Sequence, residues 1–185
     1  MEKSLDDVMI WDNFREGNKD ALSTLFKKYY PELFRYGLKI TDDREMVNDS
    51  LQDLFIDIWQ QKTPSPVLSI KAYLLKAMRY KLLKQMKLGQ SSKIELRQVE
   101  DLFHLSHESF LIKTEQDREK SDKLLTALQQ IPARQKEIIY LWYYLNLGYK
   151  EICEIMNIEY QVARNQLANA IKNLKRVIVF LVVHL

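Results

Sequence analysis

The side chains best suited to chemistry lie on the last helical stretch of the sequence, which begins near Tyr160. One arc of this stretch carries amide and basic groups and no acid, at Gln161, Asn165, Asn169, Lys172 and Arg176, with Arg164 at its border. Amide side chains suit base edges, especially those of adenine, and basic side chains suit phosphates. The stretch therefore predicts a helix that enters the major groove of DNA. An ordinary helical hairpin with a polar outer face is the alternative.

The residues before this stretch predict the elements that would position it. Asn146-Leu147-Gly148 indicates a turn, Tyr149 to Met156 a short helix, and Asn157 a second turn before the long helix. Ala163, Leu167, Ala170, Ile171, Leu174 and Ile178 form the apolar arc of the long helix. Together these elements predict a helix-turn-helix.

A second group of basic and aromatic side chains falls on a helix expected from about Ile70 to Leu88. Apolar residues occupy two stripes of this helix, so its remaining face carries Lys76, Arg79, Tyr80, Leu83 and Lys87. Charge is also segregated along the chain: residues 71–97 carry 8 basic and 1 acidic groups, whereas residues 1–63 carry 9 and 13. Two phosphate-facing surfaces are indicated, or else solvated faces of ordinary helices.

Composition and periodicity favour an all-α fold. The 185 residues include only four glycines and four prolines, too few for the turns of a β-sandwich or barrel. Helices are expected over 19–39, where Pro31 bends or interrupts the pattern, and from Asp42 or Asp43 to about Gln61. We expect two small helical domains, 1–88 and 123–185, joined by a linker over 89–122.

The sequence lacks the motifs of several enzyme classes. It contains no GxxxxGK[ST] loop and no HExxH, and its histidines His104, His107 and His184 have no cysteine cluster beside them. Cys153 falls on an apolar helix position and is interpreted as a core residue. We expect neither catalytic residues nor a metal, a cofactor or a small-molecule substrate. The polar start and the short apolar run Val177–Val183 predict a cytoplasmic protein without membrane insertion.

Four segments resemble the extracytoplasmic-function (ECF) sigma factor family, over about residues 19–88 and 123–178. They are ALSTLFKKYYPELFRYGLKITDD, DSLQDLFIDIWQQ, SIKAYLLKAMRYKLLKQMK and the long segment LLTALQQIPARQKEIIYLWYYLNLGYKEICEIMNIEYQVARNQLANAIKNLK. The resemblance implies a winged-helix-like sigma region 4 in the second domain. It also implies a chain that binds core RNA polymerase and directs initiation at promoters.

The resemblance assigns roles to three sets of residues. It implies that Asp49, Gln52, Asp53 and Trp59 bind the core polymerase. Lys76, Arg79, Tyr80 and Lys87 would bind the opened −10 element, where basic groups hold the backbone and aromatic rings stack on unpaired bases. The polar arc that begins at Gln161 would read the −35 duplex.

Some positions depart from the family pattern, and these leave promoter preference open. The usual Thr-Val-Lys at the start of the last helix is Val162-Ala163-Arg164, the usual alanine after Glu-Ile is Cys153, and a frequent Asn is Tyr80. Two other classes of function stay open at this point: a helix-turn-helix regulator that does not replace sigma, and a helical adaptor protein. The existence of an anti-sigma partner also stays open.

Overall fold

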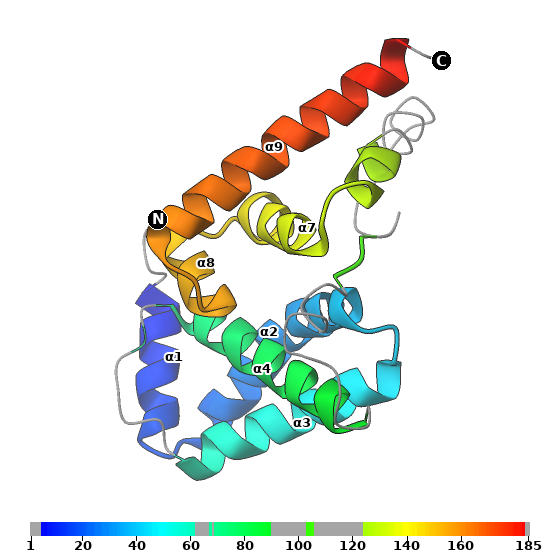
Figure 1. Cartoon of the computed structure of the whole chain (residues 1–185). Helices are drawn as coiled ribbons and strands as arrows, with labels where there is room; N and C mark the ends of the chain where they lie inside the picture. Colours follow the sequence, from blue (N-terminus) through cyan, green and yellow to red (C-terminus); the bar gives the residue numbers. More distant parts are fainter. Residues whose placement is uncertain (1–4, 62–66, 68, 90–102, 106–123, 184–185) are drawn as a thin grey trace, which may run out of the picture. The chain divides into compact units, whose positions relative to one another are not determined.

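The computed structural model describes residues 5–61, 67, 69–89, 103–105 and 124–183 (Figure 1). Regular structure within these ranges is entirely helical, which confirms the all-α prediction. The chain divides into two compact units. One comprises Met1–Ile94 with Glu154–Met156, and the other comprises Glu95–Cys153 with Asn157–Leu185.

The first unit contains α1 (Leu5–Arg15), α2 (Lys19–Ile40), α3 (Arg44–Gln61) and α4 (Ile70–Gly89). Side chains satisfy backbone N–H groups at the starts of three helices. Asn18 Oδ1 accepts the N–H of Asp20 and of Ala21 at 2.8 and 3.2 Å, Asp43 Oδ1 accepts that of Met46 at 3.0 Å, and Ser69 Oγ accepts that of Ala72 at 3.3 Å. These caps explain why α2, α3 and α4 begin where they do.

The core of the first unit forms where α2, α3 and α4 pack on one another. Each helix buries one apolar stripe: Leu25, Leu33 and Tyr36 of α2, Leu51 and Leu54 of α3, and Leu74, Leu75, Met78 and Leu82 of α4. At Gly37 the helices approach so closely that an added Cβ would lie 2.8 Å from Val47 Cγ1 and 2.9 Å from Met78 Cε. Pro31 does not interrupt α2, which continues to Ile40.

Helix α1 is absent from the elements expected from the sequence. Its polar composition hides a short apolar stripe in which Trp11 and Phe14 are buried. Trp11 contacts Tyr73 of α4 with ring centroids 5.6 Å apart, and Phe14 contacts Trp59 of α3 at 6.1 Å. Two aromatic side chains thus bind α1 to the rest of the unit.

Residues 124–129 are helical and precede α7 (Ala133–Ile139), the π-helical turn η2 (Tyr140–Tyr144), α8 (Tyr149–Met156) and α9 (Tyr160–Val183). All of these except the last three residues of α8 belong to the second unit. Helix α7 packs against α9 and η2. The turns expected at Asn146 and Asn157 are present, with positive φ of 53° and 51° at these two residues. Asn tolerates this left-handed conformation better than most residues do.

The expected linker, 89–122, lies outside the described residues except for Gly89 and 103–105. Phe103 and Leu105 are buried, and the ring of Phe103 lies 5.6 Å from that of Tyr140. At least this short segment therefore packs on the second unit. His104 between them is exposed, as expected, whereas His107 and His184 lie outside the described residues.

We expect Gly37→Ala to destabilise the first unit. The new methyl group would overpack a site where Val47 and Met78 are fully buried, at a cost of about 1–3 kcal/mol. Ala favours a helix over Gly by about 1 kcal/mol, which offsets only part of this loss. Urea unfolding followed by circular dichroism measures the change. Val47→Ala should lower the free energy of unfolding less in the Gly37→Ala background than in the wild type, because it relieves the overpacking. A Gly37→Ala chain as stable as the wild type would contradict the prediction.

Candidate nucleic-acid interface

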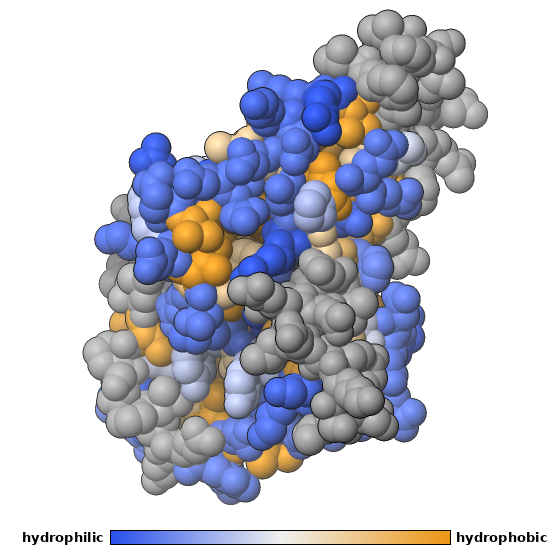
Figure 2. Space-filling view, in the orientation of Figure 1, coloured by the Kyte–Doolittle hydropathy of each residue, from blue (hydrophilic) through white to orange (hydrophobic). Residues whose placement is uncertain are grey.

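The polar arc of α9 is exposed along its whole length. Gln161, Arg164, Asn165, Asn169, Lys172 and Arg176 are all exposed, whereas Ala163, Leu167 and Ala170 on the opposite side are buried. In the space-filling view the visible side of α9 is mostly hydrophilic (Figure 2). Helix α9 contains no acidic residue. The structure therefore brings all six predicted residues onto one surface.

The turn between α8 and α9 sets the direction of α9 after α8. Glu151 Oε2 accepts the N–H of Gly148 at 2.9 Å at the start of α8. At the other end Asn157 is left-handed, and the N–H of Ile158 donates to the carbonyl of Cys153 at 3.1 Å. Capping at both ends of α8 gives the predicted helix-turn-helix, which the structure confirms.

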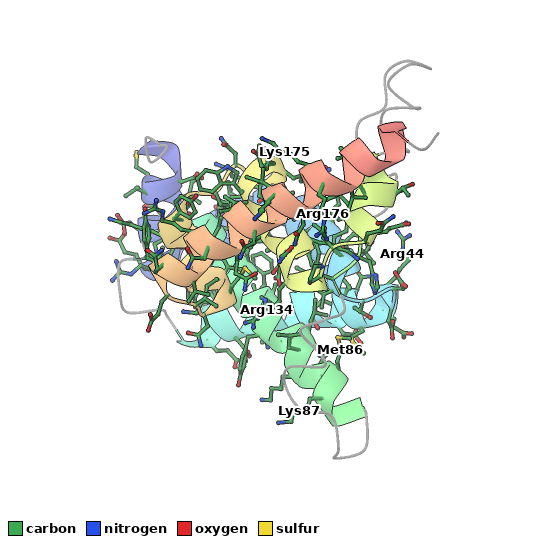
Figure 3. All side chains as sticks on the ribbon, turned by 45° about the horizontal axis from the view of Figure 1, so that its top comes forward. Arg44, Met86, Lys87, Arg134, Lys175 and Arg176 are labelled. Carbon is green, nitrogen blue, oxygen red and sulfur yellow. The ribbon has the colours of Figure 1, made fainter. Side chains whose placement is uncertain are left out.

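Helix α9 makes one side-chain hydrogen bond to α7 and one within its polar arc. Asn173 Nδ2 donates to Gln135 Oε1 of α7 at 3.0 Å, which ties the inner side of α9 to its neighbour. On the outer side Gln161 Nε2 donates to Asn165 Oδ1, also at 3.0 Å. Lys175 and Arg176 lie on either side of the α9 ribbon (Figure 3). The arc thus combines ordered amides near its start with basic groups further along.

A row of aromatic rings leads to the start of α9, and the sequence reading did not identify it. The ring of Trp142 lies 4.4 Å from that of Tyr149, which lies 5.4 Å from that of Tyr160. The aromatic run Tyr140-Leu141-Trp142-Tyr143-Tyr144 is the sequence signal for this row. Because the run forms a π-helical turn, the 3.6-residue period of an α-helix predicts the wrong directions for its side chains.

The basic face of α4 differs from the expectation at one residue. Lys76, Tyr80 and Lys87 are exposed, with Tyr80 66% exposed, and Lys87 projects from the end of α4 (Figure 3). Arg79 is only 7% exposed, so its placement on the exposed face is wrong. It lies on the stripe of Ala72, Leu75 and Leu82, at the three- and four-residue spacing of buried positions.

The other lysines of α4 differ in whether they form ion pairs with neighbouring helices. Lys71 pairs with Glu32 at 2.9 Å and Lys81 with Asp57 at 2.6 Å, so both stabilise the contact of α4 with a neighbouring helix. Lys84 is exposed one turn after Tyr80 and makes no ion pair with a described residue. The sequence reading missed Lys84, and it extends the exposed basic face.

The exposed face of α3 is acidic with one large apolar group. Asp49, Gln52 and Asp53 are exposed at helical spacing, as expected, and Ile56 continues their face with 51% of its surface exposed. Trp59 is half-buried and packs on Phe14, which gives it a structural role in the first unit. Ile56 was not among the residues predicted for this face, although its position three residues after Asp53 gives the same helical spacing.

Metal-ligating side chains and the single cysteine are the remaining groups with known reactivity. No group of three or more His, Cys, Asp or Glu residues that could hold a metal ion occurs in the part of the chain that the structure describes. Cys153 is a free, half-buried thiol, and burial raises its pKa, which disfavours the reactive thiolate. None of the described helices is long and apolar enough to cross a membrane.

Residues 121–174 match the family model of sigma-70, region 4. The predicted resemblance to a sigma factor is confirmed. The match includes α7, η2 and α8 and ends within α9. Among curated proteins, none matches the sequence significantly. The exposed arc of α9 from Gln161 to Lys172 thus belongs to the segment that is similar to sigma region 4.

Solved structures share the fold over most of the chain. CnrH, in a complex with the cytosolic domain of CnrY, is 14% identical with a TM-score of 0.61, over 92% of this chain and 96% of CnrH. The sigma factor RpoE from Bartonella quintana, in a complex with the anti-sigma factor NepR, is 17% identical with a TM-score of 0.55, over 84% of this chain and 94% of RpoE. The likeness in fold to CnrH and RpoE therefore extends beyond residues 121–174 into the first unit.

Proposed function

We propose that this chain is an ECF-type sigma factor that binds core RNA polymerase and directs it to promoters. The observation that carries the proposal is the acid-free polar arc of α9, presented by a helix-turn-helix within the region 4 match. Polar and basic side chains on such a helix suit the major groove of duplex DNA. On this proposal the polymerase performs the chemistry, and the chain acts by binding alone.

The first unit supplies two further surfaces to this function. The acidic face of α3, with Asp49, Gln52, Asp53 and Ile56, is the proposed docking surface for the polymerase. Charged groups around one exposed apolar side chain are typical of a protein interface. Because DNA phosphates would be repelled by these carboxylates, the face is unsuited to nucleic acid.

The basic face of α4 is the proposed site for the opened −10 strand. Lys76, Lys84 and Lys87 would contact the phosphate backbone, and Tyr80 offers an exposed ring for base stacking. Arg79 is buried, so we assign it a supporting role inside the unit. RpoE of B. quintana was solved with an anti-sigma factor, and we include a protein inhibitor of this class among the partners of the chain.

Asp53→Lys should weaken binding to core polymerase at least about tenfold, since it reverses a charge at the centre of the α3 face. Ile56→Ala should also weaken binding, but its effect should depend little on salt because an apolar contact is lost. Fluorescence anisotropy of the labelled chain with core polymerase at two salt concentrations measures both. Asp12→Lys, on the surface of α1, is the matched control, and equal affinities for Asp53→Lys and this control would remove α3 from the interface.

Tyr80→Ala should reduce promoter opening without unfolding the chain, because a side chain that is 66% exposed contributes little to the core. Loss of a stacked base costs about 1–3 kcal/mol. Permanganate reactivity of −10 thymines in the polymerase complex reports the opening. Tyr143→Ala is a matched control, since Tyr143 is also 66% exposed but lies on η2. Full opening by the Tyr80 variant would show that its ring does not stack on DNA.

Lys172→Ala should weaken binding to all duplexes alike and lower the slope of log affinity against log salt by about one unit. A phosphate contact carries no sequence information, so the order of preference among −35 variants should not change. Competition binding at several salt concentrations measures both quantities. Lys27→Ala, an exposed residue of α2, is the control. An unchanged slope for Lys172→Ala would place this residue away from the backbone.

A further inference from the structure

The hydrogen bond between Gln161 and Asn165 limits what these two amides can present to a ligand. Gln161 Nε2 donates to Asn165 Oδ1 at 3.0 Å across one turn of α9, and both side chains are exposed. In each amide the oxygen and the nitrogen diverge from the same planar carbon. The oxygen of Gln161 and the nitrogen of Asn165 therefore face away from the shared bond.

As a result, one oxygen and one nitrogen take no part in the shared bond, and these two atoms present an acceptor and a donor side by side. The same holds if Asn165 donates to Gln161 instead. The free atoms are then the nitrogen of Gln161 and the oxygen of Asn165, which are again one donor and one acceptor. Two independent amides could each rotate to suit any base, whereas a bonded pair keeps one group of each kind. The bond thus restricts the bases that the pair can recognise.

Among the base edges of the major groove, adenine matches this pattern. Adenine offers the N7 acceptor and the N6 amino donor next to each other, whereas guanine offers two acceptors, N7 and O6. Gln161 Oε1 would accept from N6 and Asn165 Nδ2 would donate to N7. Guanine at the same position would leave the Gln161 oxygen against O6, without a proton between them.

The surroundings of the pair allow close approach to a base. Ala168 is exposed on the same face, one turn after Asn165, and its side chain is a single methyl group. Helix α9 carries no acid that would repel DNA. We propose that Gln161 and Asn165 form one coupled reader of an adenine in the −35 duplex. This inference rests on the proposed sigma function and adds the base that the pair selects.

Gln161→Glu tests the coupling, because a carboxylate cannot donate to Asn165 Oδ1. Asn165 should then turn its nitrogen to Glu and its oxygen outward, so that the pair presents two acceptors. Such a pair suits the N4 amino donor of cytosine. We expect the preference for adenine over cytosine at one position to fall by about 5- to 150-fold or to reverse. Gln166→Glu, which adds the same charge off the polar arc, should leave the preference unchanged.

The experiment uses the full chain bound to core polymerase and a library of duplexes randomised in the −35 region. The adenine selected by the wild type is then replaced by 7-deazaadenine, which lacks the N7 acceptor. This replacement should weaken binding of the wild type by about fivefold or more and leave the Gln161→Glu chain almost unaffected. The contrast arises because only the wild-type Asn165 donates to N7.

The outcomes separate this inference from the proposed function. If polymerase and duplex binding persist but Gln161→Glu keeps the adenine preference and the response to 7-deazaadenine, the coupled reader is overturned while the sigma function stands. If Gln161→Glu weakens all duplexes equally, the pair acts by charge alone, which also overturns the inference. If the wild-type chain forms no polymerase complex, the proposed function itself fails.

Discussion

Burial of one apolar stripe on each helix is the constraint on which the functional surfaces depend. In α9, Ala163, Leu167 and Ala170 are fixed in the core, so the side chains half a turn away must face solvent. Helix α9 packs against α7, and the hydrogen bond between Asn173 and Gln135 of α7 favours the same rotation of α9. A helix rotated by one residue would turn each position by about 100° and remove the amides from the exposed face.

The same constraint explains why charge alone does not define the site on α4. The basic residues of this helix all carry a positive charge, but their surroundings are of three kinds. Lys71 and Lys81 are held in ion pairs with α2 and α3, Arg79 occupies a buried position, and Lys84 is exposed. A buried charge is costly unless polar groups compensate it. Arg79 therefore belongs to the interior of the first unit and is not available to an external ligand. Only the exposed lysines are accessible to a polyanion.

Much of the second unit could be predicted because its signals are local. Asn157 adopts the left-handed turn that its residue type favours, and the periodicity of α9 alone gives the correct exposed face. The errors concern tertiary packing. Helix α1 is stabilised by the contacts of Trp11 and Phe14 with distant rings, which no local pattern reveals. Ile56 has an apolar side chain of the kind that usually lies in a core. Only the packing of α3 shows that this side chain is exposed.

The charges of the exposed faces argue for two kinds of partner. A face with Asp49 and Asp53 repels DNA, and at physiological salt this repulsion extends over about 8 Å, the length of one or two helical turns. The acid-free arc of α9 attracts DNA by the same rule. A regulator that contacts only DNA would have no use for the acidic face with Ile56 exposed at its end. A sigma factor requires both surfaces, since it must bind a protein and a promoter at the same time.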